Sequence, residues 1–392
     1  MKNLNSVQRS FLFNILALIV IGIVMIYNST VIYAQGTFGE AYKFIILHIG
    51  WLLIGSISFI IVYKIDYHKL PNYLYPLLFF TIGPLSLLAV IGLLRQTNLI
   101  ACTPDSFLFP CINGASRWIY LNFPFLTKLP FINSLSFQPA ELAKLVLIIY
   151  LAYMLSKFSK SARFETSYEP LKITLIATGI VSFLIFLQPN LSTASLVFLI
   201  GLSVYFASGF PLKPFLYIVP GTFLAGLLFI LLSDYRRARL LTLFNSSTDA
   251  SLGAGYHIQQ IQIALGSGGF WGLGIGQSRQ KFQYLPEVAA DSIFAIIGEE
   301  LGFIGTTAVV VLFLTLIYKG YTIAKLAPDL LGSLLAVGIT TWIGFQFFVN
   351  VAAMTQILPL TGVPLPLISY GGSSTIFTLM GLGILMNISK HV

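Results

Sequence analysis

The sequence predicts an all-α integral membrane protein. We expect a single membrane domain over residues 1–392, a bundle of about ten transmembrane helices with a large extracytoplasmic loop between helices 7 and 8. The composition is 57% hydrophobic and only 9% charged, whereas soluble domains average about 25% charged residues. Apolar windows of about 20 residues, enough to cross a bilayer as a helix, recur along the chain. Lipid must therefore surround most of it.

The apolar segment 11–33 follows Lys2 and Arg9. It is too long for the core of a signal peptide and has no A-x-A cleavage site, so we interpret it as a retained first span. The further expected spans are 43–63, 72–94, 139–156, 171–187, 191–208, 214–233, 290–318, 330–352 and 371–388.

The basic residues predict the orientation of the spans. The connections 64–70, 157–170, 209–213 and 319–329 all carry Lys or Arg, and Lys390 lies in the C-terminal tail. By the positive-inside rule these segments are cytoplasmic, which places both termini in the cytoplasm. The formal charge of +9 forms no sustained basic run, so we interpret it as membrane-flanking charge and expect no nucleic-acid partner.

Two long segments, 95–138 and 234–289, then lie outside. They hold basic residues that an anionic ligand at the outer face would explain, namely Arg117, Lys128, Arg236, Arg237, Arg239, Arg279 and Lys281. Cys102 and Cys111 both lie in the first segment. On an oxidising side they are candidates for a disulfide, and in a reducing cytosol they would stay free thiols. Nothing nearby offers the further His or Cys that a zinc site needs.

The run 266–276 is rich in glycine (GSGGFWGLGIG). It lacks a dinucleotide-binding context, and the chain has no phosphate-binding G-x-x-x-x-G-K-[ST] motif, which argues against ATP-driven transport. We therefore expect a bent or re-entrant loop in which small residues permit close backbone approach.

Two of the outer segments carry charged residues, and the charged residues of each segment have two possible roles. In 137–145 (FQPAELAKL), Pro139 suits the first turn of a helix, and Glu141 and Lys144 share one helix face. They form either an interfacial ion pair or a charged patch in an outer cavity shared with Asp291. In 114–118 (GASRW), Arg117 and Trp118 are either a membrane anchor or a grip on a phosphate and a sugar face.

Asp291 is the strongest candidate for chemistry. It follows 285–290 (LPEVAA) at the start of an apolar span, where the helix dipole favours a negative charge. A helix-capping carboxylate is the structural alternative. Glu299 and Glu300 lie about 12 to 13 Å deeper, and we expect both to face the bundle interior with polar partners. Gly298, Gly302 and Gly305 permit close approach of a neighbouring helix.

The segment 358–374 (LPLTGVPLPLISYGGSS) cannot form a regular spanning helix because of its prolines and glycines, so it is expected to be a rigid outer loop entering the last span. With this segment the chain resembles the SEDS family (FtsW, RodA, SpoVE) of membrane glycan polymerases. Its motifs are similar to LP-x-TG-[IV]-PLP-[FL]-[IV]-SYGGSS, FQPSE-x-x-K, G-[AS]-x-R-W and LPE-x-H-T-D. The chain departs from the last of these motifs at Ala289 and Ala290, where His and Thr are usual. It also has Gln188-Pro189-Asn190 where the family usually has Gln-Pro-Asp, and segment 95–137 is longer than expected for the family.

The resemblance implies a peptidoglycan glycosyltransferase that joins lipid II units at the outer leaflet of the bacterial inner membrane, for division or elongation. It implies Asp291 as the catalytic base, with Arg117 and Lys144 as cationic partners of the pyrophosphate. The residues implied to bind substrate are Arg117, Trp118, Gln138, Glu141, Lys144, Glu287, Ser369, Gly371, Gly372 and Ser373. The expected cofactor is at most a divalent metal (Mg or Mn), with no nucleotide, since the donor is already activated.

The expected partners are lipid II, membrane lipids and a class B penicillin-binding protein, a transpeptidase. Two alternatives share the same bundle: a lipid II flippase, and a non-catalytic scaffold of the division or elongation complex. An outer carboxylate beside cations favours catalysis, whereas a flippase should also show a polar path in the cytoplasmic half.

Overall fold

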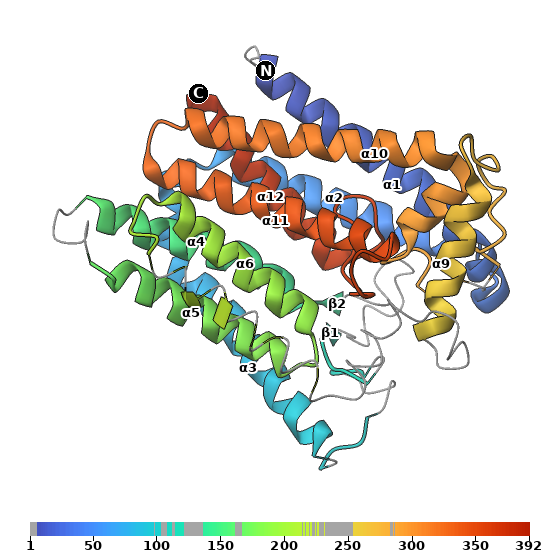
Figure 1. Cartoon of the computed structure of the whole chain (residues 1–392), viewed down its shortest axis with the longest axis horizontal. Helices are drawn as coiled ribbons and strands as arrows, with labels where there is room; N and C mark the ends of the chain where they lie inside the picture. The colour runs from blue at the N-terminus through green and yellow to red at the C-terminus, as the bar shows by residue number, and fades with distance from the viewer. Residues whose placement is uncertain are drawn as a thin grey trace.

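The computed structural model describes residues 6–97, 99–102, 108–111, 114–120, 136–160, 167–213, 254–282, 285 and 287–392, together with single positions between 215 and 231. Within them, eight helices are long and apolar enough to cross a membrane, and a further apolar helix of 17 residues, Leu191–Ala207, is shorter. The chain is a helical bundle (Figure 1). The predicted fold class is confirmed.

The helices of the first half are α1 (Ser6–Phe38), α2 (Lys43–Lys64), α3 (Leu74–Gln96), α4 (Pro139–Ser159), α5 (Glu169–Phe186) and α6 (Leu191–Ala207), with the 3₁₀ helix η1 (Tyr67–Tyr73) before α3. Those of the second half are α9 (Ala254–Gly268), α10 (Ile293–Leu326), α11 (Leu330–Met354), α12 (Gly372–Ile388) and the short η3 (Ser389–His391). Strands β1 (Ile119–Tyr120) and β2 (Ser136–Phe137) pair antiparallel, with Ile119 opposite Phe137.

The helices match the expected spans, with two differences in the second half. Helix α9 lies in a segment that was expected to be loop, because its amphipathic sequence AGYHIQQIQIALGSG is too short and polar to register as a span. Helix α10 continues to Leu326 rather than ending near residue 318. The expected span 214–233 lies mostly outside the described residues, as do Lys128, Arg236, Arg237, Arg239 and Pro286.

The centre of the bundle is formed by α4, α11 and α12 (Figure 1). About 67% of the apolar window of α4 and of α11, and 72% of that of α12, is buried inside the protein, against 28% for α2 and α3 and 22% for α10. Outer helices of a membrane bundle keep apolar side chains on the lipid side, because lipid is as apolar as the core. The inner helices carry buried polar residues, such as Glu141 and Lys144 on α4 and Gln346 and Asn350 on α11.

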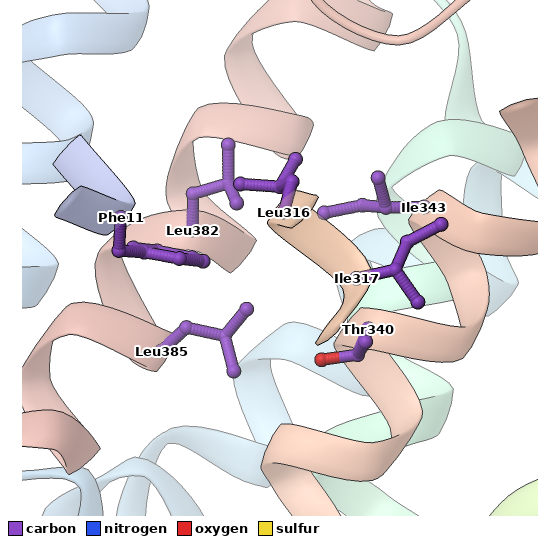
Figure 2. A pocket seen from close by; sticks show the side chains of 7 residues that line it. All are labelled: Phe11, Leu316, Ile317, Thr340, Ile343, Leu382 and Leu385. Carbon is purple, nitrogen blue, oxygen red and sulfur yellow. The ribbon is translucent and has the colours of Figure 1, made fainter. Parts of the chain in front are cut away.

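Apolar packing between α1, α10, α11 and α12 leaves a small gap with no room for a water molecule (Figure 2). Its lining is apolar except for one hydroxyl: Phe11, Leu316, Ile317, Thr340, Ile343, Leu382 and Leu385. Because this gap has no room for water and is lined by apolar side chains apart from the Thr340 hydroxyl, we interpret it as a packing defect.

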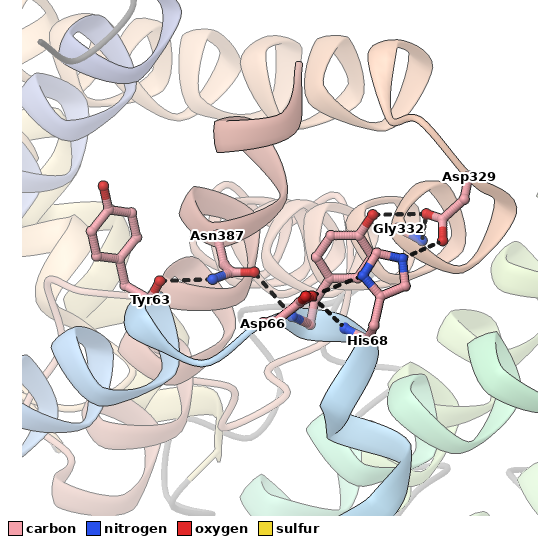
Figure 3. Close-up of polar contacts among 7 residues, drawn as sticks. Tyr63, Asp66, His68, Asp329, Gly332 and Asn387 are labelled. Atoms are coloured by element: carbon pink, nitrogen blue, oxygen red, sulfur yellow. Dashed lines mark hydrogen bonds and ion pairs between the residues drawn. The ribbon is translucent and has the colours of Figure 1, made fainter. Parts of the chain in front are cut away.

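Both termini lie at one end of the bundle (Figure 1), where the Gln8 side chain donates to the backbone oxygen of Ser389 at 2.9 Å. A polar cluster at this end joins the α2–η1 connection, the α10–α11 connection and helix α12 (Figure 3). His68 on η1 lies between two carboxylates, with Nδ1 at 2.8 Å from Asp66 and Nε2 at 2.9 Å from Asp329. Asn387 of α12 donates to the Tyr63 oxygen at 2.7 Å and accepts from the Tyr67 N–H at 3.0 Å.

Helix α10 is interrupted at Gly302, whose backbone (φ 65°, ψ −162°) is not helical. The glycine run that follows α9 lies in this break: the N–H groups of Leu273 and Gly274 donate to the oxygens of Glu299 and Glu300 at 3.0 Å each. A Cβ atom at Gly268 would lie 1.9 Å from the Gly298 oxygen, so only glycine permits this approach. The bent loop expected from the sequence is confirmed, but the spanning helix beside it is broken rather than continuous.

Candidate active site

The loop that carries Asp291 is fixed by backbone contacts at the start of α10. The N–H groups of Ala290 and Ser292 donate to the Glu287 oxygen at 3.0 and 3.3 Å, and Glu287 has a left-handed backbone with φ 49°. Asn350 of α11 donates to the backbone oxygen of Asp291 at 2.8 Å. These contacts hold Asp291 two residues before the first residue of α10, where the helix dipole favours a carboxylate.

The same loop is joined to segment 358–371, which was expected to be rigid. The Tyr370 N–H donates to the Ala289 oxygen at 2.8 Å. The second N–H of the Asn350 amide donates to the Val363 oxygen at 2.8 Å. A single asparagine of α11 therefore holds both outer loops, and Gly362 lies so close to Asp291 that its Cβ would be 3.6 Å from Oδ2.

The Asp291 carboxylate is half-buried, and its two oxygens have different neighbours. Ser292 Oγ donates to Oδ1 at 3.5 Å, and His257 Nε2 of α9 lies 2.8 Å from Ser292 Oγ. Oδ2 lies on the side of the loop that carries Gly362, and Gly362 is exposed. One oxygen thus points toward a hydrogen-bonded side chain and the other toward the exposed loop.

The predicted ion pair of Glu141 and Lys144 forms, with Nζ at 2.7 Å from Oε1, but it is not a patch in an open cavity. Glu141 is 3% and Lys144 2% exposed. Lys144 also donates to Gln346 Oε1 at 2.9 Å and lies over the ring of Trp342. The Lys144 ammonium therefore binds side chains of α4 and α11, and a contact between Lys144 and substrate stays a prediction.

Gln346 extends this buried pair toward the outer loops. Its Nε2 donates to the Pro364 oxygen at 3.0 Å, and its Oε1 also accepts from Trp342 Nε1 at 2.8 Å. Gln346 and Asn350 are four residues apart and so share one face of α11. Along this face, successive side chains bind the ion pair, segment 362–366 and the Asp291 loop.

Arg117 also has intramolecular partners. Its guanidinium donates to the backbone oxygens of Gln188 at 3.5 Å and Pro189 at 2.5 Å, in the turn between α5 and α6. Arg117 therefore holds this turn, and a contact between Arg117 and a phosphate stays a prediction. Asn190 accepts from the Thr193 N–H at 3.3 Å as the N-cap of α6, so its side chain is structural here.

The remaining predicted substrate residues divide into internal and accessible groups. Ser369 Oγ accepts from the Leu365 N–H at 2.8 Å, and Ser373 Oγ accepts from the Gln138 N–H at 3.0 Å. Gly372 packs against Trp51, whose ring would lie 2.6 Å from an added Cβ. The two serines are buried, so we assign Ser369, Gly372 and Ser373 a structural role. The accessible residues are Trp118, Gln138, Glu287 and Gly371.

The first outer segment is held by covalent and polar contacts. Cys102 and Cys111 form a disulfide with Cα atoms 5.3 Å apart, which confirms the bonded alternative. Arg95 at the end of α3 donates to the Phe109 oxygen at 2.8 Å and to Ser116 Oγ. These contacts fix the part of the segment that leads into Arg117 and Trp118.

Glu299 and Glu300 are buried in the bundle, as expected, and have polar partners. Glu299 accepts from Ser278 Oγ at 2.5 Å and from the Arg279 N–H at 2.9 Å. Glu300 lies 3.6 Å from Lys281 Nζ. The two carboxylates therefore hold the loop that follows the glycine run, which is a structural role.

A cavity of about 360 Å³ lies between α9, α10 and α11. It spans the break in α10 and begins at Phe294, three residues after Asp291. Its lining is mainly apolar with three threonines: Leu265, Gly269, Phe294, Gly298, Gly302, Phe303, Thr306, Thr307, Val310, Val351 and Thr355. The cavity is large enough for part of an extended hydrocarbon chain.

The described part of the chain contains no group of three or more His, Cys, Asp or Glu side chains placed to hold a metal ion.

Sequence reasoning missed His257, Ser292, Gln346 and Asn350. His257 could have been noticed as one of only four histidines in the chain, in a segment expected at the outer face. The two amides lie inside an apolar span, where uncharged polar residues give a weaker signal than a carboxylate.

The long apolar helices define a multi-pass membrane protein. Its polar site lies at one end of the bundle, where α10 is broken beside the glycine loop and a half-buried carboxylate is held at the start of α10. The chain matches the family model FtsW/RodA/SpoVE, described as cell cycle protein, over residues 8–392. It belongs to this family.

Individual relatives and solved structures are consistent with this family membership. The chain is 35% identical over 379 residues to a probable peptidoglycan glycosyltransferase FtsW of Geobacter sulfurreducens, covering 96% of this chain and 93% of the relative. It is 34% identical over 383 residues to stage V sporulation protein E of Bacillus subtilis, covering 96% and 95%.

Among solved structures, a chain of a peptidoglycan synthase complex superposes with a TM-score of 0.70 at 26% identity, covering 97% of this chain and 96% of that one. The rod shape determining protein RodA of Thermus thermophilus superposes with a TM-score of 0.65 at 25% identity, covering 97% and 95%.

Proposed function

We propose that this chain is a peptidoglycan glycosyltransferase, a multi-pass protein of the bacterial inner membrane that polymerises glycan strands from lipid II. The observation that carries the proposal is the Asp291 carboxylate, held half-buried at the start of α10 by Asn350 and the Tyr370 segment. Family membership over 8–392 and relatives named as glycosyltransferases support it.

The reaction requires a base at the membrane surface. The pyrophosphate of the donor leaves as the acceptor hydroxyl attacks the anomeric carbon, and the hydroxyl proton goes to a general base, giving inversion at that carbon. Asp291 is that base. Oδ2 faces the exposed side of the loop near Gly362, where an acceptor hydroxyl would approach.

The binding surface around Asp291 is formed by the accessible residues Trp118, Gln138, Glu287 and Gly371. The buried Lys144 and the engaged Arg117 position the loops that carry this surface. The cavity between α9, α10 and α11 begins one helical turn from Asp291 and suits the polyprenyl chain of a lipid-linked sugar, because its lining is mainly apolar.

The proposal includes an orientation and a partner. Both termini lie at the end of the bundle opposite the start of α10 (Figure 1), and we infer from the positive-inside rule that this end is cytoplasmic. A class B penicillin-binding protein is the proposed transpeptidase partner, supported by the likeness to a chain of a peptidoglycan synthase complex. A divalent metal stays a prediction from the resemblance, with pyrophosphate as its main ligand.

The test is polymerisation of purified lipid II by the full chain with its transpeptidase partner, scored as glycan strands on a gel. Asp291→Asn should lower the rate by about 10²- to 10⁴-fold, the usual contribution of a general base. Its size-exclusion profile should match that of the wild type. Near-normal strand formation by Asp291→Asn would remove the catalytic assignment, and transport of lipid II without polymerisation by the wild type would identify a flippase.

A further inference from the structure

Three side chains form a continuous hydrogen-bonded line from Asp291 into helix α9. Ser292 Oγ donates to Asp291 Oδ1 at 3.5 Å, and His257 Nε2 lies 2.8 Å from the same Oγ. Ser292 is fully buried and follows Asp291 directly in the chain, whereas His257 comes from an element 35 residues earlier and is half-buried. The fold therefore brings an imidazole to the rear of the carboxylate, on the side away from Gly362.

We propose that His257 is the proton acceptor that returns Asp291 to its charged form after each transfer, with Ser292 as the intermediate carrier. The inference rests on the proposed function, since it requires Asp291 to act as a base. His257 is a positioning and proton-accepting residue: it does not touch the reacting sugar.

The proton balance of this step is complete. After Asp291 has taken the acceptor's proton, the carboxylic acid gives a proton to Ser292 Oγ while the Ser292 hydroxyl proton passes to His257 Nε2. Asp291 becomes a carboxylate and Ser292 again carries one proton. His257, which enters the step with its proton on Nδ1, becomes an imidazolium, and loss of the Nε2 proton to water restores the starting tautomer for the next round. The hydrogen bonds then run from His257 to Ser292 and from Ser292 to Asp291, and the second is the direction that the structure shows.

The chemistry favours transfer in this direction. In general an imidazole binds a proton more tightly than a carboxylate does, so an imidazole joined to a carboxylic acid through a hydroxyl is a suitable acceptor for its proton. A base that must act in every round of polymerisation needs to lose its proton in every round. Between Glu287 and Asp291 the three residues are apolar, namely Val288, Ala289 and Ala290.

The rest of α9 docks without this line of contacts. Gln262, also on α9, donates to Gln356 Oε1 just after α11 at 2.8 Å. Ile258, Ile261 and Ala264 are buried apolar residues of the same helix. Since packing and the Gln262 contact already hold α9, the imidazole is not needed to attach the helix, and Gln262 provides a matched control.

The experiment measures kcat and KM for lipid II with the full chain and its partner in four variants: His257→Gln, His257→Ala, Ser292→Ala and Gln262→Ala. Glutamine keeps a hydrogen-bonding group near the position of Nε2 but cannot bind the proton. We expect His257→Gln to lower kcat by about tenfold or more with KM nearly unchanged, below the about 10²- to 10⁴-fold loss from removing the base itself. Gln262→Ala should stay within about twofold of the wild type, since the lost contact is exposed and makes a small contribution.

Two further measurements separate proton transfer from a structural role. Added imidazole should restore part of kcat in His257→Ala but not in Ser292→Ala, which lacks the carrier. The double variant His257→Gln/Ser292→Ala should be no slower than the slower single variant, because groups that act as one unit are not additive. A kcat of His257→Gln within twofold of the wild type would overturn the inference, as would additive losses. An inactive wild type would instead overturn the proposed function.

Discussion

Asn350 holds the Asp291 loop, and its replacement by alanine tests whether that contact positions the carboxylate. The amide donates to the backbone oxygens of Asp291 and Val363 at 2.8 Å each, and Asn350 is only 1% exposed. Losing two such hydrogen bonds should lower the free energy of unfolding by about 2 kcal/mol, at about 1 kcal/mol each. A displacement of the loop by about 1 Å should lower kcat by on the order of 10²-fold.

The control is a second buried asparagine at the other end of the bundle. Asn387 is 2% exposed and also makes two hydrogen bonds to backbone, with Tyr63 and Tyr67 (Figure 3). Asn387→Ala should therefore lose a similar unfolding free energy. It should keep kcat within about twofold when measured below its unfolding temperature, because it is far from the loop that carries the base.

The assay combines thermal unfolding in detergent with lipid II polymerisation per folded molecule, both at a temperature where each variant stays folded. Reduced kcat for Asn350→Ala alone would support the positioning role. Equal turnover by the two alanine variants would refute it, because the effect would then be a general consequence of lower stability.

The remaining predictions concern the two polar clusters away from Asp291. Lys144→Ala leaves the 3%-exposed Glu141 without its cation and should destabilise the protein by about 3 to 5 kcal/mol, while Lys144→Met with Glu141→Leu should recover most of that loss in thermal unfolding. Normal stability with a raised KM for lipid II would instead restore the substrate-contact interpretation of Lys144. At the terminal end, hydrogen bonds from the backbone and side chain of His68 hold the pKa of Asp66 below its ordinary value of 3.8. This contribution to stability is present above pH 3.8 and is lost as the pH falls through the lowered pKa, so Asp66→Asn should reduce the pH dependence of the unfolding temperature in that acidic window. An unchanged pH profile in the variant would contradict the contribution of Asp66.

The local features of the chain could be predicted from the sequence because each depends on residues that are close together along the chain. Spans follow from about 20 consecutive apolar residues, since a helix of that length crosses the bilayer and satisfies its own backbone hydrogen bonds. The bend at 266–276 follows from glycines that accept conformations and approaches closed to other residues, as at Gly268. Asp291 was recognised as a candidate because placing a carboxylate beside an apolar span costs free energy, so such residues usually have a function or a buried partner.

Only the tertiary structure decided which side chains lie near Asp291 and which partners the charged residues contact. Lys144 reads as a surface lysine near a helix start, yet α11 covers it and Gln346 takes its hydrogen bond. Arg117 is joined to a turn more than 70 residues away, and His257 reaches Ser292 only because α9 packs beside α10. Helical periodicity predicts which side chains share a face, but the partner of that face comes from another helix. Side-chain hydrogen bonds between distant segments depend on how helices pack, and no local pattern encodes that arrangement.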